Sequence, residues 1–141
     1  MSAPRYQLTP GGRLVHDPSA GGVGWRLLGP NNRELGRAAL AYPDAEEALA
    51  AVAVVRILAS AGAAHIVHES TATPWVWHLE NEDGRVVATS GRGFRHEREC
   101  RYNLEQFRDA APTAPASDAT VPPQFAWQRE AAEALQPGGT P

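Results

Sequence analysis

The sequence repeats itself, and this internal repeat constrains the fold more than any other feature. Residues 13–56 align without a gap with residues 65–108, at an offset of 52 positions. Random matching over such a length would give about three identities. The alignment has eight: Val15/Val67, His16/His68, Ala20/Ala72, Trp25/Trp77, Leu27/Leu79, Arg33/Arg85, Glu47/Glu99 and Arg56/Arg108. The repeat predicts two similar structural units that share a core, because neither unit alone can bury its apolar face.

The clearest copy of a repeated segment lies in residues 75–94, which read WVWHLENEDGRVVATSGRGF. Trp75, Trp77 and Leu79 occupy every second position, which is the period of a strand with one buried face. Asp83-Gly84 follows, and Asp-Gly is favoured in tight hairpin turns because both residues tolerate positive φ. We therefore expect a hairpin whose second strand covers residues 85–90.

Each copy is expected to form three strands and a helix. The first copy predicts strands at residues 13–17, 23–28 and 33–39 and a helix over about residues 44–61. The second predicts strands at residues 65–69, 75–80 and 85–90 and a helix over about residues 96–111. The fold class is therefore α+β, with two tandem β-β-β-α repeats that share one antiparallel sheet with two packed helices about a pseudo-twofold axis. An intermolecular version of this arrangement, a homodimer, is the alternative.

The two predicted helices differ in their ends and in their surfaces. Asp44 and Glu47 are placed as a capping box for the first helix, and Gly62 is placed to end it. His96 stands where Asp44 stood, so the second helix lacks this cap. The first helix is apolar nearly all round, which predicts burial against the sheet and a further partner. The second carries only an apolar stripe, made of Cys100, Leu104 and Phe107.

The composition changes outside the repeats. We divide the chain into an N-terminal segment (1–12), a first repeat (13–64), a second repeat (65–111), a Pro- and Ala-rich linker or edge strand (112–124) and a short amphipathic tail (125–141). The two repeats together form one domain. In the tail, Phe125, Trp127 and Leu135 are candidates for docking to a partner. A clamp that folds back on the domain is the favoured alternative, because exposed large aromatic side chains are costly without a partner.

Three motifs of the second copy resemble those of a known family. They are W-V-W-H-L at residues 75–79, D-G-R-V-V-A-T-S-G-R-G-F at residues 83–94 and C-R-Y-N-L at residues 100–104. These motifs resemble the YegP-like family, small domains of unknown function that often occur as tandem repeats. The first copy departs from the pattern, since residues 38–42 read AALAY and Asn31-Asn32 replaces Asn-Gly. The resemblance implies β-β-β-α repeats on one sheet and carries no catalytic residues.

Length, composition and charge bound the class of protein. With 141 residues and 43% apolar content, the chain can build its own core, so no cofactor is expected. The net charge of −3 argues against a nucleic-acid-binding surface over the whole molecule. Cys100 is the only cysteine, which fits a reducing compartment. The longest apolar run, residues 48–64, contains Arg56 and is short for a membrane span. We expect a soluble cytoplasmic protein with no membrane partner.

Arginine side chains gather in one part of the second copy. Residues 91–108 contain five arginines and three glutamates. The candidates for anion or RNA binding lie near a glycine-rich loop at a predicted helix start, where an anion can bind: Arg92, Arg95, Arg98 and Arg101. Helical spacing also pairs Glu97 with Arg101 and Glu105 with Arg108. A solvated, salt-bridged helix face is therefore the favoured interpretation.

One set of side chains has the residue types of a cysteine nucleophile site. His96, Cys100 and Asn103 fall at i, i+4 and i+7 of the second predicted helix. Cys100 aligns with Ala48, a core-facing position, so a small buried thiol is the favoured interpretation. The repeat-related histidines His16 and His68 lack the spacing of a metal site. We assign no catalytic residue and no metal ligand.

These observations favour a non-enzymatic module that binds a protein partner or its own copy. The alternative is anion or RNA binding through the arginines of residues 92–108. A cysteine-dependent enzyme is the weakest of the three, because catalysis requires an acid, base or nucleophile set that converges on one point. The sequence does not identify the partner.

Overall fold

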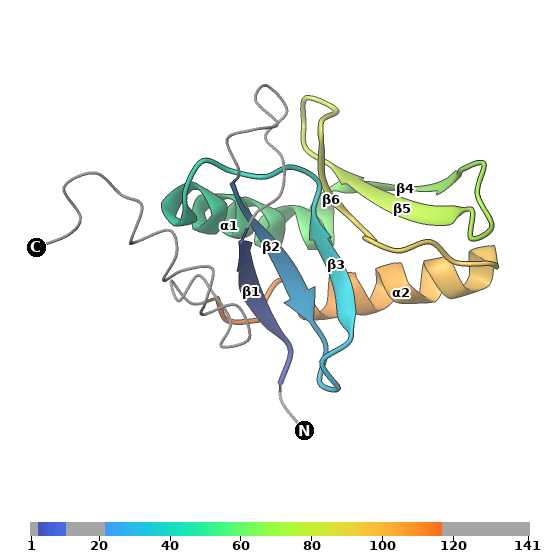
Figure 1. The fold of residues 1–141 in the computed structure, drawn as a ribbon, viewed down its shortest axis with the longest axis horizontal. Coiled ribbons are helices and arrows are strands. Elements are labelled where there is room, and N and C mark those ends of the chain that lie inside the picture. Colours follow the sequence, from blue (N-terminus) through green and yellow to red (C-terminus); the bar gives the residue numbers. More distant parts are fainter. Residues whose placement is uncertain (1–2, 11–21, 117–141) are drawn as a thin grey trace, which may run out of the picture.

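The computed structural model describes residues 3–10 and 22–116, which form a six-stranded sheet and two helices (Figure 1). All neighbouring strands run antiparallel, in the order β1-β2-β3-β6-β5-β4. In chain order the elements are β1 (Arg5–Pro10), β2 (Val23–Leu28), β3 (Glu34–Ala38), α1 (Ala45–Ala61), β4 (Ala63–His68), β5 (Trp75–Glu80), β6 (Val86–Thr89) and α2 (Glu97–Ala110). The predicted α+β class, with one antiparallel sheet and two helices, is confirmed.

The first strand lies earlier in the chain than the repeat predicted. In the sheet, Leu8 of β1 pairs with Trp25 of β2. The corresponding pair in the second half of the chain is Ile66 of β4 with Trp77 of β5. The two tryptophans are 52 positions apart, but their partners are 58 apart, so the first strand does not follow the gapless alignment.

The connection between the first two strands explains this shift. It covers residues 11–22, whereas the connection between β4 and β5 covers only residues 69–74. A gapless alignment cannot match connections of such different length. The segment 1–12, which the sequence analysis left outside the repeats, therefore contains β1. The strand predicted at residues 13–17 lies outside the described residues.

The remaining elements follow the sequence closely. β2 and β5 have the predicted bounds. At the start of α1, the Asp44 side chain accepts a hydrogen bond of 2.8 Å from the Glu47 backbone N–H, and Gly62 follows the last residue of the helix. His96 precedes α2 without a side-chain capping bond. The predicted difference between the two helix starts is confirmed.

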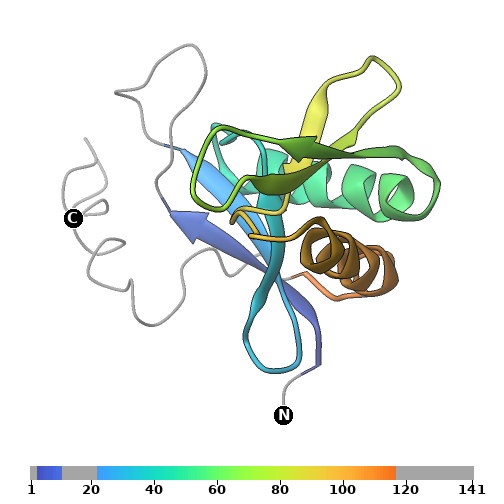
Figure 2. The ribbon, with the colours of Figure 1, turned by 90° about the vertical axis from the view of Figure 1, so that its right-hand side faces the viewer.

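Both helices cover the same face of the sheet, as the side view shows (Figure 2). The core between these layers is built around Trp25, Trp77 and Phe107. The Phe107 ring centroid lies 6.5 Å from that of Trp25 and 4.7 Å from that of Trp77, so one ring from α2 contacts both halves of the sheet. Aromatic rings bury more apolar area than other side chains. The two halves therefore share a single core, and the opposite face of the sheet is uncovered by any described element.

Each helix carries one arginine that bonds to the backbone at or beyond the end of the other helix. Arg108 of α2 donates to the carbonyl oxygens of Ala59 and Gly62 at the end of α1, at 3.4 and 3.3 Å. Arg56 of α1 donates to the carbonyl oxygen of Ala114, just beyond α2, at 2.8 Å. Cations stabilise helix C-termini because the last carbonyl groups carry partial negative charge. Arg108 therefore stabilises the end of α1, whereas Arg56 binds the segment that follows α2.

The segment after α2 returns to the first strand. The Tyr6 backbone N–H donates to the Pro115 carbonyl oxygen at 2.9 Å, and the Tyr6 hydroxyl donates to the Ala111 carbonyl oxygen at 2.8 Å. Burial raises the pKa of the Tyr6 hydroxyl, and the nearby Arg56 opposes this shift. The beginning of the predicted linker, as far as residue 116, is thus packed along β1. The rest of the predicted linker or edge strand, from residue 117 to residue 124, lies outside the described residues.

One face of α1 is more exposed than the sequence predicted. Val54 and Ile57 leave 48% and 70% of their surfaces accessible. The all-round burial predicted for this helix is wrong for the described residues, because the sheet covers only one side of it. Within residues 3–10 and 22–116, none of the helices combines the length and apolar content that a membrane crossing requires.

Candidate functional site

Two grooves lie between the helices and the sheet, at corresponding places in the two halves of the chain. The α1 groove, about 400 Å³, is lined by Tyr42, Glu47, Ala50, Ala51, Val54 and Val87. The α2 groove, about 190 Å³, is lined by Arg33, Glu34, Leu35, Arg92, Phe94, Glu99, Tyr102, Asn103 and Gln106. At the offset of 52, Ala51 corresponds to Asn103 and Val54 to Gln106. The first groove is therefore mostly apolar and the second mostly polar.

A buried hydrogen bond connects the α2 groove to the core. The Trp77 Nε1 donates to Asn103 Oδ1 at 2.5 Å, and Asn103 is only 6% exposed. Trp25 holds the corresponding position in the first half and is 1% exposed, yet its Nε1 has no hydrogen-bond partner among the described residues. Ala51 stands where Asn103 would provide the acceptor. A buried donor without a partner lowers the stability of the fold. The core beside the α1 groove therefore lacks a stabilising hydrogen bond that the core beside the α2 groove has.

The loop of residues 90–94 forms one end of the α2 groove. The Ser90 hydroxyl donates to the Arg92 carbonyl oxygen at 2.7 Å. Gly91 has a φ of 79°, a conformation that favours glycine, and a Cβ at Gly93 would strike the Thr73 carbonyl oxygen. The Arg92 guanidinium lies over the Phe94 ring, with its carbon 4.8 Å from the ring centroid. These contacts fix the loop against its neighbours.

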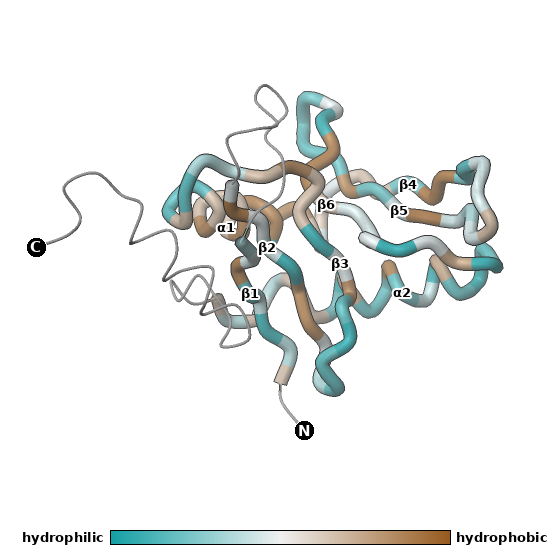
Figure 3. The backbone as a smooth tube through the Cα atoms, in the orientation of Figure 1, coloured by the Kyte–Doolittle hydropathy of each residue, from teal (hydrophilic) through white to brown (hydrophobic). Residues whose placement is uncertain are grey.

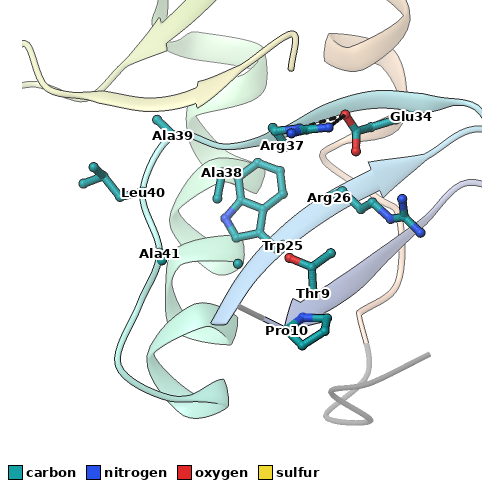
Figure 4. A pocket seen from close by; sticks show the side chains of 11 residues that line it. Thr9, Pro10, Trp25, Arg26, Glu34, Arg37, Ala38, Ala39, Leu40 and Ala41 are labelled. Carbon is teal, nitrogen blue, oxygen red and sulfur yellow. Dashed lines mark hydrogen bonds and ion pairs between the residues drawn. The ribbon is translucent and has the colours of Figure 1, made fainter. Parts of the chain in front are cut away.

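The uncovered face of the sheet carries two further clefts. The first, about 360 Å³, lies beside residues 38–41 and is lined in part by Arg26 and Arg37. Figure 4 shows this cleft, with the nitrogen edge of the Trp25 indole turned toward residues 38–41. The second, about 450 Å³, lies beside the loop that contains Arg92 and also includes Arg37. Arg37 forms an ion pair of 2.7 Å with Glu34, so its positive charge is neutralised within the protein.

A row of polar side chains crosses this face from edge to edge. The row consists of residues at directly paired strand positions: Gln7, Arg26, Arg37, Thr89, His78 and His65. The Arg26 Nε donates to the Gln7 Oε1 at 2.8 Å. Sequence reasoning missed this row. Alternation along each strand assigns these residues to one face, but only the register between strands aligns them.

The fold can now be compared with known proteins. No model of a known protein family matches the chain, and no curated protein matches its sequence. Among solved structures, a UPF0339 protein from Shewanella oneidensis matches with a TM-score of 0.64 and 13% identity, over 82% of this chain and 90% of that chain. YegP from E. coli matches with a TM-score of 0.54 and 10% identity, over 83% of this chain and 93% of that chain. The chain has the YegP fold.

The likeness to YegP agrees with the family resemblance of the sequence motifs and with an α+β fold on one sheet. YegP is itself described as a protein of unknown function, so the likeness brings no ligand or reaction to this chain. At 10–13% identity, it is the arrangement of strands and helices that is shared. The chemistry of the grooves must therefore be argued from the residues of this chain.

Within the YegP fold, the four candidate arginines do not gather around one cavity. Arg92 borders the α2 groove and the larger cleft on the uncovered face. Arg95 and Arg98 are exposed and line neither groove, and Arg101 forms an exposed ion pair of 3.1 Å with Glu97 on α2. Arg108 binds the end of α1 rather than Glu105. Of the ion pairs expected on this helix face, only that between Glu97 and Arg101 forms among the described residues. Arg92 differs from the other three candidates because it borders both a groove and a cleft.

His96, Cys100 and Asn103 do not form a catalytic arrangement. Cys100 is fully buried, and this burial raises the pKa of its thiol from 9.0 to about 11, with a smaller opposing effect of Arg101. A nucleophilic cysteine requires a thiolate, which such a pKa disfavours at neutral pH. His96 is exposed at the start of α2, and the Asn103 oxygen is occupied by Trp77. The arrangement favours the structural interpretation of Cys100.

The remaining predicted residues have the following places. His65 lies 3.4 Å from a Glu80 carboxylate oxygen, and the His68 ring contacts that of Trp75 edge to face at 4.8 Å. In the described part of the chain, no three His, Cys, Asp or Glu side chains are grouped so that they could hold a metal ion. The docking candidates Phe125, Trp127 and Leu135 lie outside the described residues. His16 lies outside them as well.

Proposed function

We propose that this protein is a non-enzymatic binding module that associates with a second copy of itself through the exposed face of α1. The observation that carries the proposal is an apolar stripe on this face. Ala50, Ala53, Val54 and Ile57 fall at i, i+3, i+4 and i+7, and all four are exposed. This spacing places them on one side of a helix, the pattern by which helices bind one another. Figure 3 shows brown, apolar segments along α1.

The geometry of the stripe favours a second copy as the partner. Ala50 and Ala53 are small enough to let two helices approach closely, and Val54 and Ile57 supply apolar area to bury. In an antiparallel pair, a twofold axis would bring each stripe onto its copy, as in most homodimers. The opposed helix dipoles of such a pair attract each other.

Sedimentation velocity of the full chain over a wide concentration range tests this proposal. We expect a reversible monomer–dimer equilibrium that Ile57→Asp abolishes, because the dimer would bury the new carboxylate without a partner. Thr71→Asp adds the same charge to an exposed loop away from α1 and should leave the dimer intact. A wild-type protein that remains monomeric at the highest concentration would overturn self-association, even if another protein were found to bind α1.

We also propose that the chain arose by internal duplication and that its two halves are related by a pseudo-twofold axis. Four features recur at an offset of 52: the buried Trp25 and Trp77, the bridges from Val23 to Tyr42 and from Trp75 to Phe94, the bulges after Leu27 and Leu79, and the bonds from Arg56 to Ala114 and from Arg108 to Gly62. The last pair supports the axis most strongly, because it joins the two halves reciprocally. The fold match and the motifs at residues 75–79, 83–94 and 100–104 support the further proposal that the chain is a member of the YegP-like family.

Anion or RNA binding through the arginines is the second candidate function. One specific observation favours it: Arg92 lies between a groove and a cleft and makes no ion pair with the described residues. Arg95, Arg98 and Arg101 would then act as surrounding positive charge. Arg98→Glu should weaken binding to a single-stranded RNA in a fluorescence-anisotropy titration. Equal binding by the variant and the wild type would contradict a role for these helix arginines.

A further inference from the structure

We propose that the α2 groove binds a carboxylate group, held by the Asn103 side-chain amide and the Arg92 guanidinium. This site lies on α2 and is separate from the α1 stripe through which self-association is proposed. Its ligand class is a small carboxylate or the carboxylate end of a larger molecule, such as a peptide C-terminus. Four observations support it: the fixed orientation of Asn103, the position of Arg92, the balance of charge and the size of the groove.

Asn103 is oriented by its buried hydrogen bond. The indole Nε1 of Trp77 can only donate, so the Asn103 oxygen must face it. The NH₂ group of the same amide is then directed away from the indole, and Asn103 lines the α2 groove. Because the side chain is 94% buried, it keeps one conformation before any ligand arrives. A fixed donor binds an acceptor without the entropy cost of ordering it.

Arg92 supplies a second donor at the same groove. Its guanidinium lies over the Phe94 ring, and its backbone carbonyl is held by the Ser90 hydroxyl. It makes no ion pair with the described residues, so its charge is available to a ligand. A guanidinium binds a carboxylate through two parallel hydrogen bonds, because both groups are planar and their atoms match in spacing. A singly charged carboxylate is favoured over a doubly charged tetrahedral anion, because Glu34 and Glu99 in the lining repel a dianion more strongly.

The charges around the groove also favour an anion. Arg33 joins Arg92 in the lining, and two carboxylates, Glu34 and Glu99, oppose them. Glu34 is engaged by Arg37, whose Nη2 and Nε lie 2.7 and 2.8 Å from its Oε2. Glu99 is exposed to solvent, which screens its repulsion. When Arg37 is counted with the four charged lining residues, three arginines face two glutamates, which gives a formal charge of +1 around the groove.

The size of the groove limits the ligand. At about 190 Å³ it is smaller than the pockets of about 300–1,000 Å³ that enclose drug-sized molecules. It has room for a carboxylate and a few further atoms, while the rest of a larger ligand would lie outside. The α1 groove cannot bind in this way, because Ala51 and Leu40 stand where Asn103 and Arg92 provide the donors.

An NMR titration of the full-length, uniformly ¹⁵N-labelled protein tests the site. The probes are sodium acetate and N-acetylglycine, with sodium sulfate as the tetrahedral comparison, all at constant ionic strength. We expect saturable shifts of the Asn103 side-chain amide and the Arg92 Nε–H resonances with both carboxylates, and weaker binding of sulfate. Arg92→Gln should raise the apparent Kd about tenfold, since the loss of a charge-assisted hydrogen bond costs about 1.4 kcal/mol more than that of a neutral one.

Arg95→Gln is the matched control. It removes the same charge from an exposed arginine three residues away that lines neither groove, so its Kd should equal that of the wild type. Both arginines are exposed, and the unliganded spectra report whether each variant is folded. Shifts that rise linearly without saturation, or an equal loss of affinity in both variants, would overturn the proposal. Either result would leave the test of self-association untouched.

Discussion

Trp25 and Trp77 hold corresponding positions in the two halves of the molecule, but their surroundings differ. The Trp77 indole donates to Asn103, whereas the buried Trp25 indole has no acceptor among the described residues. The groove next to Trp25 is apolar and belongs to a helix with an exposed apolar stripe. The groove next to Trp77 is polar and borders a loop with two constrained glycines. The two halves thus have similar cores and different chemistry at their helix–sheet grooves.

In the two proposals made above, the first half contacts another protein surface and the second half binds a polar group. An apolar helix face gains free energy by leaving water, with little dependence on direction. A fixed amide and guanidinium act through directed hydrogen bonds instead. Substitutions that exchange residues between the two halves test this contrast directly.

The largest expected effect is at the loop of the second half. Gly93→Ala should destabilise the protein by about 3 kcal/mol, since the new Cβ would meet the Thr73 backbone, which has little freedom to move. The corresponding residue in the first half is already Ala41. Ala41→Gly, the reverse exchange, should cost under about 1 kcal/mol. Urea unfolding of both variants measures the difference, and similar midpoints would show that the two loops are not constrained differently.

A smaller loss is expected when the second half is made to resemble the first. Asn103→Ala leaves the Trp77 indole without an acceptor and should lower the free energy of unfolding by about 2 kcal/mol. Gln106→Ala, on the exposed part of the same helix, should change it by less than about 0.5 kcal/mol. Thermal or urea unfolding at neutral pH compares the two. Equal stabilities would mean that the bond to Trp77 contributes little.

The smallest expected effect is a gain in the first half. Ala51→Asn places an acceptor near Trp25 and should stabilise the protein by about 1 kcal/mol. The recovered hydrogen bond contributes about 1.5 kcal/mol, and the lower helix propensity of Asn costs about 0.6 kcal/mol. The indole N–H resonance of Trp25 should also move on formation of the bond. A variant with unchanged indole shift and lower stability would contradict the correspondence between positions 51 and 103.

The sequence predicted those elements whose signals are local. β2 and β5 follow from alternating apolar residues, and the start of α1 follows from Asp44 and Glu47. β1 was missed because the long connection over residues 11–22 breaks the repeat register that located the other strands. Of the candidate site, Arg92 and Asn103 were singled out from the sequence. Their meeting with Arg33 at one groove was not, because β3, the loop and α2 are far apart in the chain.

The sequence by itself determined the composition of the core and the order of its elements, because a buried face requires apolar side chains at the period of a strand or helix. The tertiary structure decided which polar groups the core had to satisfy. Trp77 and Asn103 are 26 residues apart, and nothing in either segment alone indicates that they form a bond. Only the packing of α2 against β5 brings the donor to its acceptor. The packing of α1 against β2 leaves the Trp25 donor without an acceptor among the described residues, and in this the two halves differ although their sequences are alike.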